Sequence, residues 1–558
     1  MTKENPSVAR RRGGRRRAFA LFVSLLGLSF ALSGTPASQE AQKGERRTSG
    51  PRVVVNLAEL ARQEALSPPK REPKVAPFMP MPGPEPAVPP GVVIPLAEEP
   101  AGPPPEREPT VVLSPAPAAS FAALGDNNTR IPPDTMGAVG PNHLMVTLNT
   151  EVRVQNRSGT ALSTVSLESF WAPTGAVISF DPKLVYDPFG NRWIFSAVSS
   201  PASADSSVLI GASQTSDPTG SWNLYRIDAD ATDMNWADFP SLGFNKNWVV
   251  VSVNTFTNAT DAFVGGEVYA FSKANLYAGA ALGFTRFVVT GGAGATFGPA
   301  ITYDNTLETM HLVQHWNGNF MGNGFLRLST ITGAVGSETL TEGTAFVQTP
   351  NPWAFGPPGF ADFAPQKDTT AKIQNNDSRI SNVVFRNGSL WTTQNAFLPA
   401  SSPTRTAVQW WQFLANGTLQ QFGRVDDSSG TLFYAFPSIA VNSQNDVLLG
   451  FSRFSANQFA SGNYAFRAST DTPNTMQTDV TLKDGEATYF KTFSGTRNRW
   501  GDFSSTVVDP VNDLDMWTIQ EYAASPVSGS DRWGTWWGKI EVATTPPAKK
   551  RRGQVISE

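Results

Sequence analysis

Short runs in which apolar and polar side chains alternate fill the chain from about residue 119 onwards, and turns rich in Gly, Asn, Asp and Pro separate them. Alternation with a period of two is typical of β-strands. One stretch shows four such runs in succession, at residues 183–187, 192–199, 207–214 and 222–227. Four antiparallel strands joined by short turns predict one small sheet, the blade of a β-propeller.

The first run of this stretch belongs to a repeated motif of the form Pro/Thr-x-Leu/Ile/Ala-x-Tyr/Phe/Val-Asp/Asn. The step between copies is 47 residues from Gly140 to Asp187 and 82 residues from Asp304 to Arg386. A repeat of ~40 to 60 residues of strand predicts a propeller, here with seven four-stranded blades. Tandem β-sandwich domains are the alternative, but they need a unit of about 90 to 100 residues. The copies are TMGAVG (135–140), PKLVYD (182–187), PSLGFN (240–245), PAITYD (299–304), SNVVFR (381–386), PSIAVN (437–442) and SSTVVD (504–509).

The last repeat offers three clear strands, at 504–508, 516–522 and 536–542, before a polar tail begins at Thr544. A fourth strand must therefore come from elsewhere in the chain. Residues 119–123 can form a strand and directly precede the first repeat. We expect them to complete the last blade, because this pairing closes the ring and removes exposed sheet edges.

Composition divides the chain into a leader and a globular part. Residues 1–38 join an Arg-rich segment (10–17) to an apolar run (18–32) and small residues, which predicts an export signal peptide, with Arg16-Arg17 resembling a twin-arginine motif. The apolar run is shorter than the ~20 residues of a membrane span, and no integral span is expected once the signal is removed. Residues 39–118 are Pro-rich and predict a disordered linker, with a transient helix or a disordered leader at 53–66.

The remaining expectations are a propeller domain at 119–543, a disordered basic tail at 544–558, and a secreted, periplasmic or cell-surface location. The formal charge of -3 gives no basic field for nucleic acid. The chain has no Cys, which excludes disulfides, thiol catalysis and Cys-ligated metals. We expect a monomer whose partner is a glycan or another surface protein.

Three phrases carry a resemblance to a known family: residues 132–141 (PPDTMGAVGP), 180–187 (FDPKLVYD) with Arg192-Trp193, and 499–503 (RWGDF). Over about residues 120–543 the chain resembles exported bacterial proteins with sialidase-like β-propeller folds, which largely lack an assigned activity. Residues 217–222 (DPTGSW) also resemble the Asp-box turn of sialidases, with a departure of one residue on each side of the glycine. Asp boxes are structural, so this likeness implies fold and not sugar cleavage.

Acidic residues stand at or beside the start of several inner strands. The start points of inner strands surround one mouth of a propeller's channel, so we expect Asp134, Asp181, Asp238 and Asp502 to form a negative rim that binds a cation or sugar hydroxyls. The alternative is that each Asp caps its own turn. Arginines lie near the same phrases, and Arg192, Arg379 and Arg499 are the candidate ligand-binding residues among them, because guanidinium groups bind carboxylates in a bidentate way.

The resemblance also implies what a sialidase would need, namely a Tyr nucleophile with a Glu partner and an Asp acid/base. Glu521, Tyr522 and Asp134 are the weak candidates for these roles. Adjacent residues of a strand point to opposite faces, so Glu521 is poorly placed to activate Tyr522. This argument favours a binding or scaffold module for a glycan or surface protein, with a sialidase-type glycoside hydrolase as the alternative.

No metal site or cofactor is predicted. His311 and His315 would share a strand face about 13 Å apart, too far for one zinc ion. The acidic loops 228–233 and 509–515 predict solvated turns, with bound Ca²⁺ as the alternative. The insertion at 349–368 is either part of the binding face or a passive loop. Its aromatic residues and some of the tryptophans after residue 499 either pack between blades or stack on sugar rings.

Overall fold

The computed structural model describes residues 41–68, 73–76, 85, 112–290 and 294–542. The expected signal peptide and basic tail lie outside these residues. All of the described elements belong to the unit that begins at Gln39. None of the helices within the described ranges combines the length and the apolar character of a bilayer-spanning segment.

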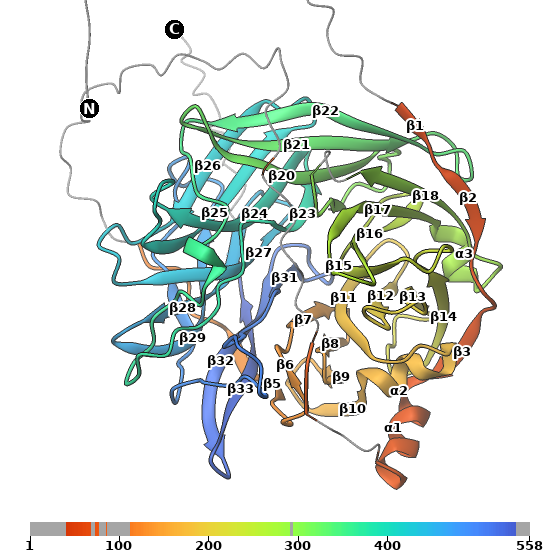
Figure 1. Cartoon of the computed structure of the whole chain (residues 1–558), viewed down its shortest axis with the longest axis horizontal. Coiled ribbons are helices and arrows are strands. Elements are labelled where there is room, and N and C mark those ends of the chain that lie inside the picture. Colours follow the sequence, from red (N-terminus) through yellow and green to blue (C-terminus); the bar gives the residue numbers. More distant parts are fainter. Residues whose placement is uncertain (1–40, 69–72, 77–84, 86–111, 291–293, 543–558) are drawn as a thin grey trace, which may run out of the picture. The chain divides into compact units, whose positions relative to one another are not determined.

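This unit is a β-propeller of seven four-stranded antiparallel blades (Figure 1), which confirms the predicted fold. The first three blades are β7–β10 (Met136–Val139, His143–Thr147, Glu151–Asn156, Ala161–Ser166), β11–β14 (Ser179–Asp187, Arg192–Ser199, Ser207–Ser213, Ser221–Asp228) and β15–β18 (Asn235–Phe244, Trp248–Thr257, Phe263–Ser272, Gly283–Thr290). The next three are β19–β22 (Gly298–Thr302, Met310–Phe320, Asn323–Thr332, Thr339–Thr349), β23–β26 (Ile380–Arg386, Ser389–Leu398, Arg405–Leu414, Leu419–Val425) and β27–β30 (Phe433–Val441, Val447–Ser455, Gln458–Arg467, Val480–Lys483). The last is β31–β33 (Ser505–Val508, Met516–Val527, Ser530–Ile540) with β5 (Ala119–Gly125).

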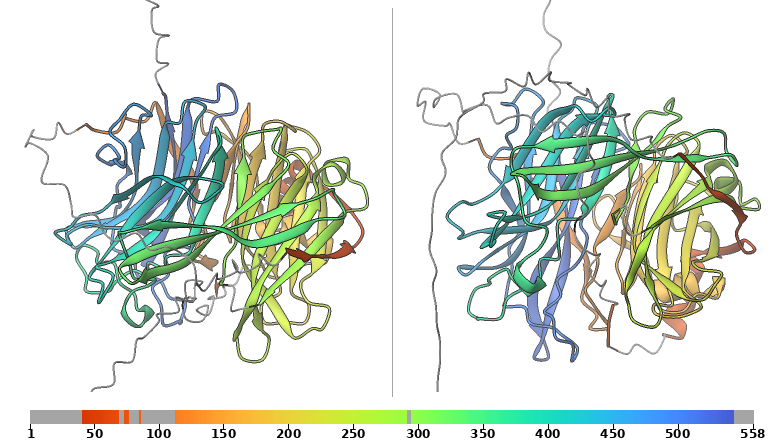
Figure 2. Two further views of the ribbon diagram at one scale, coloured as in Figure 1. Left: turned by 90° about the horizontal axis from the view of Figure 1, so that it is seen from above. Right: turned by 45° about the horizontal axis from the view of Figure 1, so that its top comes forward.

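The seven repeated motifs lie on the seven innermost strands, β7, β11, β15, β19, β23, β27 and β31. Each of these strands contacts the inner strand of the next blade, and β31 contacts β7, so the blades form a closed ring. Figure 2 shows the sheets of neighbouring blades lying face to face. The tandem-sandwich alternative is therefore wrong.

The ring closes as the sequence predicts. Strand β5 pairs antiparallel with β33, with Phe121 opposite Trp537. The Thr535 hydroxyl strengthens this junction, because it accepts a hydrogen bond from Leu124 N (3.0 Å) and donates one to Leu124 O (2.8 Å). Two segments separated by most of the chain thus form one blade.

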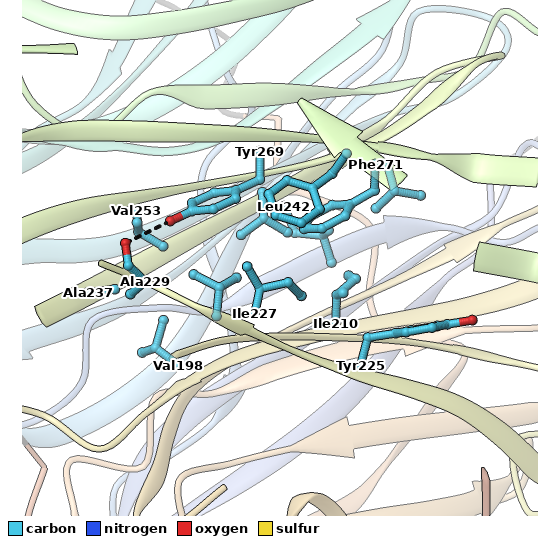
Figure 3. Packing of buried hydrophobic residues seen from close by; sticks show 14 of the residues in the cluster. Val198, Ile210, Tyr225, Ile227, Ala229, Ala237, Leu242, Val253, Tyr269 and Phe271 are labelled. Carbon is cyan, nitrogen blue, oxygen red and sulfur yellow. Dashed lines mark hydrogen bonds between the residues drawn. The ribbon is translucent and has the colours of Figure 1, made fainter. Parts of the chain in front are cut away.

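Apolar and aromatic side chains fill the wedges between blades. Figure 3 shows one such layer, in which Ile210 and Tyr225 of the second blade face Leu242 and Tyr269 of the third. Trp353 on the insertion is fully buried, as are four of the tryptophans after residue 499, namely Trp500, Trp517, Trp533 and Trp537. Packing between blades, expected for most tryptophans of the last blade, therefore holds for these side chains, and stacking on sugar rings does not.

The N-terminal residues contain ordered strands that the sequence analysis did not predict. Strand β1 (Ala41–Lys43) pairs with β22, β2 (Glu45–Thr48) pairs with β18, and β3 (Val53–Asn56) pairs with β14. This strap, residues 41–56, adds a fifth strand to three successive blades and runs along their outer margin (red in Figures 1 and 2). The outer strands present unpaired backbone groups, and backbone pairing needs no apolar side chains, which is why a Pro-rich composition did not predict it.

The helices are short. Helix α1 (Leu57–Leu66) follows the strap, starts at the Asn56 cap, whose Oδ1 accepts from Glu59 N at 3.0 Å, and buries Leu57. The helical spacing noted at 53–66 is thus a strand followed by a helix. The remaining elements are α2 (Leu167–Trp171), η1 (Ala172–Thr174), α3 (Lys273–Ala278), η3 (Pro358–Phe360) and the short pair β4 (Lys74–Val75) with β6 (Arg130–Ile131).

Candidate functional site

The four predicted acids meet where the inner strands begin, and we call this group, Asp134, Asp181, Asp238 and Asp502, the acidic mouth. Asp134 lies two residues before β7 and Asp502 three residues before β31, whereas Asp181 and Asp238 lie at register shifts within β11 and β15. Asp134 and Asp181 both have a φ of 52°. A positive φ is uncommon for residues other than Gly.

Hydrogen bonds of the acidic mouth run mainly between blades. Asn149 donates to Asp134 Oδ2 at 2.5 Å and accepts from Asp181 N at 2.8 Å. The carboxyl groups of Asp134 and Asp181 also hydrogen-bond to each other. Asp238 instead accepts a bond from Phe239 N at 2.9 Å, so the local-capping alternative fits Asp238 and not the Asp134 pair.

Two of the three predicted arginines join the acidic mouth. Arg379 forms an ion pair with Asp377 (Nε to Oδ1, 2.7 Å), and its guanidinium lies 4.2 Å from the centroid of the Phe239 ring. Arg499 pairs with Asp502 (Nη2 to Oδ2, 3.1 Å) and donates to the carbonyl of Ala76 at 3.2 Å. Both guanidinium groups are thus held in place by a buried acid.

Arg192 does not join this group. It begins β12 opposite Asp187, at the other end of the second blade, and donates to the carbonyl oxygens of Gly190 and Asn191. Arg192 follows Asp181 closely in the sequence, which predicts that the two lie side by side. The hairpin between β11 and β12 instead places Arg192 at the opposite end of the blade from Asp181.

Lys183 is a member of the site that the sequence analysis missed. Its ammonium nitrogen lies 2.9 Å from the centroid of the Phe503 ring, and the residue is buried. Burial lowers the pKa of Lys183 to about 7, although the charges of Asp181 and Asp134 act in the opposite direction. Its signal in the sequence is a single cation within an inner strand, two residues after Asp181.

Three carboxyl groups of the acidic mouth, those of Asp134, Asp181 and Asp238, have raised pKa values. Burial, followed by the charges of Asp502 and Asp181, raises the pKa of Asp134 well above its usual value, and burial with the charge of Asp238 does the same for Asp181. Burial raises the pKa of Asp238 to about 7 against the opposing hydrogen bond from Phe239 N. The site therefore combines carboxyl groups of raised pKa with two guanidinium groups.

The structure separates the two residues considered for nucleophilic catalysis. Glu521 is buried, and its pKa is raised well above the usual value by burial and then by the charge of Asp134. Tyr522 points to the other face of β32, where its ring packs edge-on against Trp536 (6.0 Å between centroids) with the Lys483 ammonium 5.0 Å from the ring. Glu521 thus neighbours the acidic mouth, and Tyr522 does not.

The insertion at 349–368 lies on the same side as the acidic mouth. Asp362 binds Arg497 Nε at 2.7 Å and Asn498 N at 2.8 Å, next to Arg499. The residues that follow the insertion contribute Asn376, which donates to Asp502 Oδ1 at 2.9 Å. Of the two readings for this segment, its position favours a part in the binding face.

The candidate metal ligands are engaged elsewhere. His311 stacks on Phe385, whereas His315 Nε2 lies 2.7 Å from Glu85 Oε1. In the loop at 509–515, the acids pair with Arg157, Arg386 and Lys539. Across the described ranges, no group of three His, Cys, Asp or Glu residues is arranged to hold a metal ion.

Neither a protein-family model nor a curated protein matches this chain. Among solved structures, the chain is similar to an α-L-arabinofuranosidase from Fusarium graminearum (10% identity, 77% of this chain and 98% of that chain, TM-score 0.34). It is also similar to a protein of unknown function from Dyadobacter fermentans (10%, 64% and 94%, 0.33) and to the endosialidase of phage phi92 (9%, 66% and 68%, 0.29). At these identities and scores the likeness carries no argument about function, and the sialidase-like assignment stays a prediction.

Proposed function

We propose that this protein is an exported, non-catalytic module that binds a glycan or another surface protein at the acidic mouth. The carrying observation is that charged side chains from five of the seven blades converge there, at the start of β7, β11, β15, β23 and β31. Carboxyl and guanidinium groups are the side chains that bind sugar hydroxyls and acidic groups with defined geometry.

One oxygen atom of the acidic mouth is placed to bind a ligand. Asp238 is 2% exposed, and its Oδ2 has no hydrogen-bond partner. A buried carboxyl oxygen without a partner costs about 1–3 kcal/mol, so a ligand hydroxyl that reached it would recover that free energy. The positive charges of Arg379 and Arg499 lie close enough to Asp238 to act on its pKa, and the three groups together present both signs of charge.

The separation of Glu521 and Tyr522 argues against sialidase chemistry, because a Tyr nucleophile needs a neighbouring base. A different observation keeps a glycoside hydrolase as the second candidate. Asp134 and Asp181 are hydrogen-bonded carboxyl groups with raised pKa values, and a carboxylic acid that stays protonated near pH 7 is what a general acid requires.

A glycan array probed with the full chain, with a parallel assay of product release from sialosides and arabinosides, separates these functions. Saturable binding without product supports the binding module. Asp238→Ala should weaken binding at least tenfold, whereas Asp484→Ala, which changes an exposed acid just after the outermost strand β30 of the sixth blade, should leave it unchanged. Product released by the wild type and lost in Asp134→Asn would instead establish the hydrolase.

A further inference from the structure

The opposite end of the channel contains a cavity of about 260 Å³. It lies where five inner strands end, so its walls come from five blades. Asp181 and Tyr186 stand five residues apart in the same strand, which separates this cavity from the acidic mouth by roughly 16 Å. The lining consists of Ala138, Val139, Val185, Tyr186, Pro188, Phe189, Ile301, Tyr303, Arg386, Val507, Val508, Pro510 and Asp513.

The walls of this cavity are chiefly apolar. Aliphatic side chains of the inner strands form its sides, and the rings of Tyr186, Phe189 and Tyr303 add flat surfaces. The apolar surface continues outward, since Phe189 is 43% exposed and the neighbouring Val511 is 64% exposed. Such a lining favours an apolar or aromatic molecule over a sugar, which would need more hydrogen-bonding groups.

Arg386 supplies the one cationic group of the lining. It is 4% exposed, and its guanidinium lies 4.9 Å from the centroid of the Tyr303 ring, which fixes its plane. Its ion-pair partner is Asp513, whose side chain is 50% exposed on the loop between β31 and β32. Because the Asp513 carboxylate is half exposed, water can solvate it when the pair opens, so the carboxylate of a ligand can replace Asp513 at Arg386.

We infer that this cavity is a second binding site, which takes a small aromatic or apolar molecule bearing one carboxylate. The apolar body would fill the space between Val185, Ile301 and Val508, and the carboxylate would bind Arg386 in place of Asp513. A cavity of 150 Å³ lined by aliphatic and aromatic groups holds benzene, so a space of this size accepts a molecule of about two fused rings.

Titration calorimetry of the full chain tests this site with two probes, 2-naphthoate and the neutral 2-naphthol. The wild type should bind 2-naphthoate about tenfold more tightly than 2-naphthol. Arg386→Met should remove this difference, whereas Asp513→Asn should strengthen 2-naphthoate binding severalfold, because Arg386 then lacks its internal competitor. Arg405→Met, which breaks the Arg405–Asp426 pair on the same blade, is the matched control and should change neither affinity.

Ile301→Trp should fill the cavity and abolish binding of both probes. Since this variant could also fold poorly, thermal unfolding accompanies it, and the Arg386 and Asp513 variants test the same site independently. The inference fails if the folded wild type binds neither probe at millimolar concentration, or if 2-naphthoate binds Arg386→Met as tightly as the wild type.

Discussion

The backbone amide of Asp502 donates a hydrogen bond of 2.8 Å to Oδ1 of Asp134, across 368 residues of chain. Asp134 precedes the inner strand of the first blade and Asp502 that of the last, so this bond joins the two ends of the ring at the axis. Strands β5 and β33 join the same ends at the outside of the last blade. The ring is therefore closed twice, near the axis by this hydrogen bond and at its outer edge by the pairing of β5 with β33.

The Asp134 bond predicts a difference between two substitutions. Asn keeps the shape of the Asp134 side chain and one of its two acceptor oxygens, which receive hydrogen bonds from Asp502 N and Asn149 Nδ2. Asp134→Ala should lower the free energy of unfolding by about 1–3 kcal/mol, since the Asp502 amide and Asn149 lose their partner, and Asp134→Asn should lower it less. Urea unfolding measures both, and equal destabilisation by Asn and Ala would contradict the role of this acceptor.

The pKa shifts at the acidic mouth predict opposite effects of pH on stability. The pKa of Asp238 rises from 3.8 to about 7 on folding, so the folded chain binds more protons than the unfolded chain in that window, and stability falls as pH rises from about 4 to about 7. The pKa of Lys183 falls from 10.5 to about 7, so the folded chain binds fewer protons there, and stability rises from about pH 7 to about pH 10.

Denaturant unfolding between pH 4 and pH 10 checks these two slopes. Asp238→Asn should flatten the fall at acidic pH without changing the alkaline side, and Lys183→Met should flatten the rise at alkaline pH. If the free energy of unfolding depends on pH in the same way for the wild type and both variants, neither group titrates in these windows.

The junction between β5 and β33 predicts a local weak point. Thr535→Val keeps the shape of the side chain but leaves Leu124 N and O without their partner, which should cost about 1–3 kcal/mol. Thr370→Val, at an exposed position, is the control and should be neutral. Hydrogen exchange should accelerate in β5 before the other strands, and an unchanged β5 would contradict the role of Thr535.

The strap at residues 41–56 protects three sheet edges. Removal of residues 41–66 exposes the outer strands β14, β18 and β22, whose unpaired backbone groups can then pair with another molecule. We expect the shortened protein to self-associate as its concentration rises, as seen by light scattering, with faster amide exchange in those strands. A shortened protein that stays monomeric with unchanged exchange would show that the strap is dispensable.

The parts of the fold that the sequence predicted are those that carry a local signal. The motif around Val185 and its six counterparts marks each inner strand, and three glycines between third and fourth strands, Gly159, Gly333 and Gly417, have the positive φ values typical of Gly in turns (91°, 103° and 86°). Strand β5 was predictable because the last repeat lacked a strand. The strap was not predictable, because it pairs with the outer strands of three blades, and these sheet edges exist only once the blades have formed.

The site was predictable only in part, for similar reasons. Acids at or near the start of four inner strands indicate one mouth, but whether Asp134 bonds to its own turn or to Asp502 depends on a left-handed backbone that the residue type does not fix. Lys183 was missed because a single cation in a strand is usually a surface residue. Arg192 was predicted to lie at the acidic mouth because it is close to Asp181 in the sequence. This prediction was wrong, because the hairpin between β11 and β12 puts the two residues at opposite ends of the blade.

The most direct test is a calorimetric titration of the wild type and of Asp238→Ala with the strongest ligand from the glycan array, with the recovered solution analysed for released sugar. We predict saturable binding to the wild type, at least tenfold weaker binding to Asp238→Ala, and an intact ligand in both. Equal affinity of the two proteins, or cleaved ligand after incubation with the wild type, would contradict a binding module centred on the acidic mouth.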